Sequence, residues 1–195
     1  MRPPANLIVV LACALAAGVA LAGAGVNVTT QHDPSVDFTK LRTYRWLPTP
    51  LYQNQQSAET RDPQLAREAL DEPIRKAVER GLSANKFRPV SSTGTPDFHV
   101  LYYAALGAAM DVNVLGAQYG YRPGWGAPVL GTTPTAPQQL DEGTLVVDLL
   151  RGDRAVAIWR GTATGTVERT RTDAERRKTI DAAVSEMFAK FPRPR

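Results

Sequence analysis

The sequence predicts an α+β fold in which a mainly antiparallel sheet is covered on one face by two helices. Three observations predict it: segments of alternating character that are typical of strands, two amphipathic helical patterns, and a hairpin pattern late in the chain. A length of 195 residues, with 43% hydrophobic and 22% charged residues, is typical of one globular domain. We therefore expect a single domain over residues 25–195, preceded by a leader over residues 1–24.

The leader has the pattern of a secretory signal peptide. Arg2 precedes an apolar run that begins at Leu7, and small residues near Ala24 offer cleavage sites. An uncleaved anchor is the alternative, because the uncharged run is about as long as a membrane helix. Cys13, the only cysteine, has the context of a lipoprotein acylation site but stands early for one. We expect export to the periplasm or cell envelope, with membrane association only if Cys13 is acylated or the leader is retained.

Three strands are predicted before the glycine-rich middle of the chain. Residues 26–31 and 43–47 alternate in character, and Tyr44 and Trp46 share one face of the second segment. Residues 97–106 are rich in aromatic and branched side chains, which favour strands. The first two segments suit half-buried positions in a sheet.

A helix is predicted between the second and third of these strands. Its apolar positions recur at helical spacing at Ile74, Ala77, Val78 and Leu82. Asp71 is placed to cap its start, and Asn85 to close it in a left-handed conformation. Residues 63–70 are also helix-prone, but Pro73 would clash with the turn before it, so we expect a break or kink there.

Residues 143–167 have the pattern of a hairpin. One face of the first strand carries Leu145, Val147 and Leu149. One face of the second strand carries Val156, Ile158 and Arg160, alternating with Ala157 and Trp159. This pattern predicts one strongly buried face with Val147 and Ile158 in the core, so we expect the hairpin to be a structural wall.

The last predicted element is a helix with a single apolar stripe. The stripe consists of Ile180, Ala183, Val184, Met187, Phe188 and Phe191. Thr172 and Glu175 have the spacing of a capping box, and Pro192 is expected to stop the helix. We expect the stripe to face the core.

The charge balance is modestly basic, with 23 Lys and Arg against 19 Asp and Glu. Export and the lack of a basic motif with interleaved aromatics exclude nucleic acid as the expected partner. Basic residues gather around the start of the last helix at Arg169, Arg171, Arg176, Arg177 and Lys178. They form a candidate anion-binding cluster, with an ordinary solvated surface as the alternative.

Residues 107–142 form a Gly/Pro-rich aromatic loop that the fold pattern leaves unexplained. Connections of this length tend to be binding loops or disordered segments. Its candidate ligand-binding residues are Tyr119, Tyr121, Arg122 and Trp125. Exposed rings of this kind can stack on sugars or enter a lipid interface. The alternative is an insertion whose rings cover one end of the sheet.

No catalytic or metal-binding pattern stands out in the sequence. His32 is expected at the surface and His99 inside a strand, and neither has a partner at metal-ligand spacing. Nucleophile-elbow and Walker-type phosphate-loop motifs are absent from the sequence. We therefore predict no enzyme activity, no metal and no cofactor.

Several segments resemble one known family in order along the chain. They are "HDPSVDFTKLRTYRWLP", "DEPIRKAVERGLSANKFRPV", "PDFHVLYYAA", "YGYRPGWG" and "EGTLVVDLLRGDRAVAIWRGTATGTV". Together they resemble the bacterial envelope family catalogued as domain of unknown function 4136, most specifically over residues 37–46 and 143–161. Many members look like lipoproteins, whereas Cys13 stands too early here. The resemblance implies an envelope location and this architecture, with no catalytic residues to transfer.

These observations together predict a non-enzymatic structural or interaction protein of the bacterial cell envelope. Its expected partner is an envelope glycan, lipid or protein. A binder of envelope glycan or lipid through the aromatic loop is the alternative, and a hydrolase with an unrecognised site is the third reading.

Overall fold

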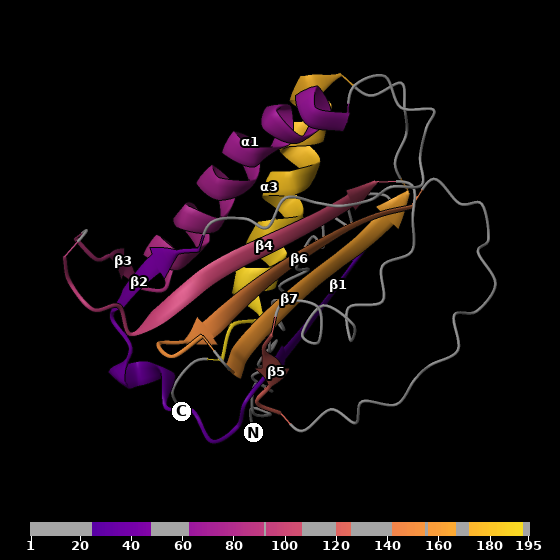
Figure 1. The fold of residues 1–195 in the computed structure, drawn as a ribbon. Coiled ribbons are helices and arrows are strands. Elements are labelled where there is room, and N and C mark those ends of the chain that lie inside the picture. Colours follow the sequence, from indigo (N-terminus) through magenta and orange to yellow (C-terminus); the bar gives the residue numbers. More distant parts are fainter. Residues whose placement is uncertain are drawn as a thin grey trace, which may run out of the picture.

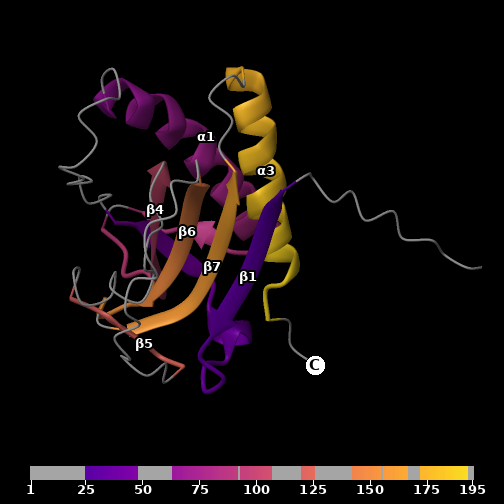
Figure 2. The ribbon, with the colours of Figure 1, turned by 90° about the vertical axis from the view of Figure 1, so that its right-hand side faces the viewer.

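The computed structural model describes residues 25–47, 63–91, 93–106, 120–125, 142–154, 156–166 and 172–192. Within these ranges seven strands form one sheet and two α-helices pack on it, so the protein has an α+β fold (Figure 1). Both helices lie on the same side of the sheet, as Figure 2 shows. We call that side the helix face and the opposite side the outer face.

The strands lie in one sheet whose order differs from their order in the chain. They are β1 Val26–His32, β2 Thr43–Trp46, β3 Arg88–Pro89, β4 Phe98–Leu106, β5 Arg122–Pro123, β6 Glu142–Arg151 and β7 Val156–Thr166. The order across the sheet is β1-β7-β6-β4-β2-β3, and β5 pairs with the start of β7, beyond the end of β1. Of the short strands, β3 and β5 have no counterpart among the elements predicted from the sequence.

The sheet is mixed, so the expectation of a mainly antiparallel sheet is wrong. β1, β7, β6 and β4 pair antiparallel in that order. β2 is parallel to both β4 and β3, and β5 is parallel to β7. The physical reason is the connection: a helix lies between β2 and β4, and such a crossover returns the chain in the same direction.

Helix α1 spans Pro63–Ala84 without the expected break at Pro73. Ile74 and Val78 are buried in the core, and this packing outweighs the local cost of an internal proline, about 3 kcal/mol. Asp71 therefore lies inside the helix and does not cap it. The left-handed residue after the helix is Lys86, with φ of 67°, and not Asn85.

Helix α3, Asp173–Ala189, begins and packs as the sequence predicts. Thr172 and Glu175 form a complete capping box. Ala183, Val184, Met187 and Phe188 are buried in the core. A side chain on Gly81 of α1 would overlap the Phe188 ring, so this glycine allows the two helices to approach closely.

The β6–β7 hairpin is a wall of the core. Val147 and Ile158 are 0% and 2% exposed, which confirms their predicted positions. The prediction that side chains of β7 alternate strictly between the two faces is wrong. Leu149 pairs with Trp159 and the next residue, Leu150, pairs with Ala157, so the pairing skips Ile158. Ile158 is the extra residue of a β-bulge, so Ile158 and Trp159 both join the core on the helix face.

At one edge of the sheet, β1 contacts the end of α3. Lys190, the C-cap residue, donates a hydrogen bond from Nζ to the backbone carbonyl of Val28 at 2.7 Å. The same amine is 2.8 Å from Oε1 of Glu186. The last turn of the helix is thereby fastened to the edge strand.

Candidate functional site

Two opposite charges lie buried on the outer face of the sheet. Asp148 of β6 and Arg160 of β7 are register partners, and they are 0% and 2% exposed. The guanidinium binds the carboxylate through two hydrogen bonds, Nε to Oδ1 and Nη2 to Oδ2, each 2.7 Å long. Taking two ions out of water is costly, and this bidentate geometry offsets the cost.

Tyr121 joins the pair as a third member. Its hydroxyl donates a hydrogen bond to Oδ2 of Asp148, and Nη2 of Arg160 donates to the hydroxyl oxygen at 3.0 Å. Burial, followed by the charge of Asp148, raises the pKa of the Tyr121 phenol. Burial alone would lower the pKa of Arg160, but the hydrogen bonds and charge of Asp148 outweigh it and raise that pKa. The phenol therefore stays neutral and the guanidinium charged.

These bonds hold residues 120–125 against the sheet. Tyr121 also packs on an apolar patch of the outer face made of Leu101, Tyr103, Val146, Leu150 and Ala157. The N–H of Gly124 donates to the carbonyl of Ala157 at 2.8 Å. A side chain at Gly124 would overlap Oδ2 of Asp33, so only glycine fits this approach.

The four candidate loop residues differ in how exposed they are in the structure. Tyr121 is 5% exposed, so its ring is not the exposed one that recognition through this residue would require; its hydroxyl has buried partners on β6 and β7. Trp125 is half-buried, and Cζ of Arg160 lies 5.9 Å from its ring centroid. Arg122 is exposed. Tyr119 lies outside the described residues.

Sequence reasoning missed Asp148 and Arg160 as site residues. It assigned Arg160 to the same face as Ile158, because it assumed uninterrupted alternation through the bulge. A simple hairpin register would not have found the pair, because the bulge shifts the pairing: Asp148 stands three residues before the Arg151–Arg154 turn and Arg160 six residues after it.

The predicted anion-binding cluster does not converge on one point within the described residues. Arg176 is paired with Asp173 at 3.1 Å on its own helix. Arg177 lines a shallow hollow of about 150 Å³ between α1 and α3, whose other lining residues are Glu72, Pro73, Lys76, Arg80 and Asp181. Lys178 is exposed. Arg169 and Arg171 lie outside the described residues.

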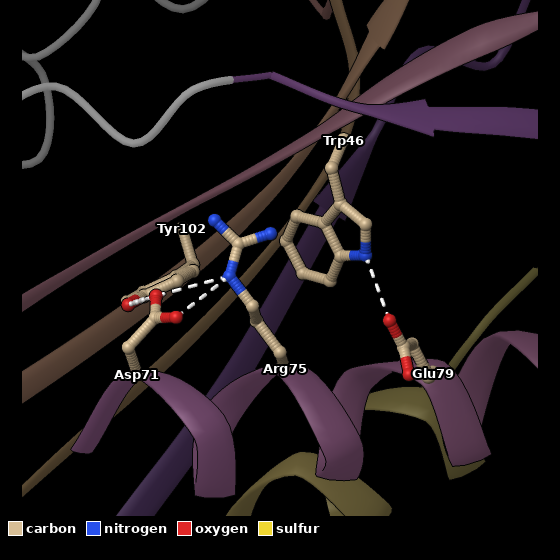
Figure 3. Close-up of polar contacts among 5 residues, drawn as sticks. All are labelled: Trp46, Asp71, Arg75, Glu79 and Tyr102. Carbon is tan, nitrogen blue, oxygen red and sulfur yellow. Dashed lines mark hydrogen bonds and ion pairs between the residues drawn. The ribbon is translucent and has the colours of Figure 1, made fainter. Parts of the chain in front are cut away.

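A second polar cluster, shown in Figure 3, joins α1 to β2 and β4. Nε of Arg75 is 3.0 and 2.9 Å from the two carboxylate oxygens of Asp71, and the Tyr102 hydroxyl also donates to Asp71. Cζ of Arg75 lies 4.6 Å from the Trp46 ring centroid, and the indole N–H of Trp46 donates to Glu79 at 3.1 Å. These contacts connect the helix to the sheet, so we interpret the cluster as structural.

The two histidines have the environments that the sequence predicts. His32 is exposed, whereas His99 on β4 is 3% exposed. Nε of Arg154, in the β6–β7 turn, donates to Nε2 of His99 at 3.4 Å. Burial, then the charge of Arg154 and that of Arg45, lower the pKa of His99. The imidazole is therefore a neutral hydrogen-bond acceptor for Arg154.

In the described part of the chain, no group of three His, Cys, Asp or Glu side chains could hold a metal ion. Neither helix in the described ranges combines the length and hydrophobicity that crossing a membrane requires.

Comparisons with known proteins extend this description. The family model "Domain of unknown function (DUF4136)" matches residues 28–193. A crystal structure of a DUF4136 family protein from Bacteroides thetaiotaomicron is similar, with a TM-score of 0.51, 15% identity, and coverage of 85% of this chain and 95% of that chain. No protein with a curated description matches the chain.

Two other solved structures have weaker similarity. A PDZ domain protein from Parabacteroides distasonis has a TM-score of 0.48 and 11% identity, covering 88% of this chain and 37% of that one. A dodecamer of a PelC variant from Paraburkholderia phytofirmans has a TM-score of 0.41 and 10% identity, covering 85% of this chain and 98% of that one.

The fold described above and its buried charged pair define a small α+β domain with a helix-covered mixed sheet. The chain belongs to the DUF4136 family, as the resemblance of its sequence segments predicts.

Proposed function

We propose that the protein is a non-enzymatic interaction protein of the bacterial cell envelope that binds its partner through residues 120–125. The observation that carries the proposal is the anchoring of this segment: Tyr121 is bound to the buried Asp148–Arg160 pair, while Arg122 is exposed and Trp125 half-buried. A segment ordered before binding loses less conformational entropy when the partner arrives. The anchor therefore supports a preformed recognition surface formed by residues 120–125.

The envelope location is proposed from the leader. Residues 1–24 carry the charge, apolar run and small residues of a signal peptide. The mature protein would then meet glycans, lipids and proteins of the envelope. Acylation of Cys13 or retention of the leader would tether it to a membrane.

The state of Asp148 favours binding over hydrolysis at this site. Both carboxylate oxygens accept hydrogen bonds, from Arg160 and from Tyr121, and the side chain is 0% exposed. A general base must reach a substrate proton within hydrogen-bond distance. The hydrogen-bonding capacity of Asp148 is used by Arg160 and Tyr121, and this supports an anchoring role for Asp148.

Binding of an envelope glycan or lipid is the second candidate, and the neighbourhood of Trp125 favours it. The half-buried indole offers an aromatic face near the sheet, and Arg122 offers a charged donor. Aromatic faces stack on apolar faces of ligands, and guanidinium groups bind carboxylates or phosphates. Both groups belong to the anchored segment.

The test measures binding of the protein without residues 1–24 to isolated bacterial envelopes by co-sedimentation. The double variant Arg122→Gln with Trp125→Ser is expected to bind less and to remain folded, with a modest loss of stability because Trp125 packs against the buried outer-face patch. Arg80→Gln, at an exposed arginine on α1, is the matched control for the lost charge and is expected to bind like the parent. The proposal is wrong if the parent does not sediment with envelopes, or if the double variant sediments equally well.

A further inference from the structure

The β6–β7 turn contacts a buried histidine on β4. Arg154 closes the turn that begins at Arg151, and its backbone is left-handed, with φ of 67°. Its backbone N–H donates to the Arg151 carbonyl at 2.7 Å. Its side chain reaches across to β4, where Nε donates to Nε2 of His99 at 3.4 Å. A side-chain hydrogen bond thereby joins the turn to the sheet.

The conformation of Arg154 requires support from its surroundings. A left-handed backbone is unfavourable for most residues other than glycine, and it persists where contacts fix it. Arg154 is exposed, and in the described part of the chain its side chain has the hydrogen bond to His99 but no ion pair. The imidazole therefore helps to hold the turn in this conformation.

This support depends on the protonation state of His99. The Nε2 atom of a neutral imidazole accepts a hydrogen bond when the proton of the ring is on Nδ1, whereas both nitrogens are donors in the protonated ring. Protonation would place an N–H of His99 against the N–H of Arg154. The binding of one proton therefore removes the hydrogen bond.

Two positive charges lie near the imidazole. Arg45 of β2 is the register partner of His99, and Arg154 approaches from the turn. Burial lowers the pKa of His99, the charge of Arg154 lowers it further, the Arg151 backbone opposes this in part, and the charge of Arg45 adds to the lowering. A protonated His99 would therefore also repel the Arg154 guanidinium.

The carboxylates on the same face already have hydrogen-bond partners. Asp97, two residues before His99 on β4, accepts hydrogen bonds from two backbone N–H groups at the start of β2. Asp148 of β6 is bound by Arg160. The other charged residues at this end of β6 and in its turn are exposed: Arg151 and Asp153.

We propose that the His99–Arg154 contact is a pH-sensitive switch, in which neutral His99 holds the β6–β7 turn closed and protonated His99 releases it. The turn leads into Val156, which pairs with Arg122 of β5. Release therefore occurs beside the segment 120–125. The switch is a property of the turn, so it goes beyond the proposed function and does not depend on it.

The test is NMR spectroscopy of the protein without residues 1–24 between about pH 7.5 and pH 5. The ring protons of His99 report its titration. Exchange of the Arg154 backbone N–H, corrected for the intrinsic pH dependence of exchange, reports opening of the turn. Opening is expected to increase roughly two- to tenfold as His99 is protonated, the range for losing one hydrogen bond. The N–H of Val147, in the core of the same hairpin, is expected to stay protected, which distinguishes local release from global unfolding.

Three variants serve as comparisons. His99→Gln keeps an acceptor oxygen for Arg154 but does not titrate, so its turn is expected to stay closed at every pH. Arg154→Gly adopts the left-handed backbone without a side-chain contact and is also expected to lose the pH dependence. Arg80→Gln, which removes an exposed charge on α1, is expected to behave like the parent.

Two results would overturn the switch: opening in His99→Gln as large as in the parent, or titration of His99 without a change at Arg154. Arg154→Gln supplies a measurement that does not require substitution of the buried histidine. Loss of the guanidinium is expected to raise the pKa of His99, and an unchanged pKa would also overturn the switch. Failure of the protein to bind envelopes would remove the proposed function and leave the switch standing.

Discussion

Arg160 and Asp148 face each other across the β6–β7 hairpin, both excluded from solvent and joined by two hydrogen bonds of 2.7 Å. Replacing one partner leaves the other charge buried without compensation. We therefore expect Asp148→Asn to lower the free energy of unfolding by about 3–5 kcal/mol. Urea denaturation followed by circular dichroism measures the change. Asp153→Asn, in the exposed turn, is the control for the same charge change and should cost far less.

The close approach of α1 and α3 at Gly81 gives a second prediction. A methyl group there would overlap the Phe188 ring, which is itself buried. We expect Gly81→Ala to lower the melting temperature, because overpacking of this kind costs about 1–3 kcal/mol and exceeds the helical gain of alanine over glycine. Gly152→Ala is the control, since its added carbon would lie 3.4 Å from the nearest atom, the carbonyl of Pro96. Equal melts for the two variants would contradict the helix packing.

The burial of His99 predicts acid sensitivity. Burial, then Arg154 and Arg45, hold the pKa of His99 below its ordinary value of 6.5, so the unfolded chain takes up the proton first. The contribution of His99 to stability is therefore full above about pH 6.5 and is lost as the pH falls below it. Denaturation between pH 5 and 8 should show this slope in the parent, and His99→Gln should flatten it. His32→Gln, at the exposed histidine, should keep the slope; a slope unchanged by His99→Gln would rule out this origin.

The capping box of α3 can be tested by a single substitution. Oγ1 of Thr172 accepts a hydrogen bond from the Glu175 backbone N–H at 3.3 Å, while the Glu175 carboxylate accepts one from the Thr172 backbone at 2.7 Å. We expect Thr172→Ala to cost about 0.5–2 kcal/mol of stability, the usual cost of losing such a cap. Ser185→Ala, at an exposed position within the helix, should be neutral or stabilising in the same thermal melts.

Elements with local signals were the most predictable from the sequence. The stripe and cap of α3 depend on residues within one helix, and the core position of Val147 follows from strand alternation. The direction of β2 was not predictable in this way, because it depends on which strand receives the chain after α1. The faces of Ile158 and Trp159 were also not predictable, because a bulge turns both side chains toward the core and the sequence pattern does not show where a bulge lies.

The candidate site was less predictable than the helices, because it is formed by contacts between residues that are far apart in the sequence. Tyr121 looked like an exposed loop residue because its partner Asp148 is 27 residues away in sequence. The position of Arg154 beside His99 depends on a left-handed turn that no residue type in the turn required. Arg122 and Trp125 were proposed as candidates from composition alone, because glycines, prolines and rings are concentrated in that segment.

The hydrogen bond from Lys190 to Val28 has a consequence for self-association. An edge strand such as β1 offers its outward carbonyls to any extended chain that could lengthen the sheet. The Val28 carbonyl is already occupied by an ammonium group, and a strand arriving there would have to displace and desolvate that charge. The end of α3 thus hinders strand-by-strand polymerisation at the β1 border of the sheet.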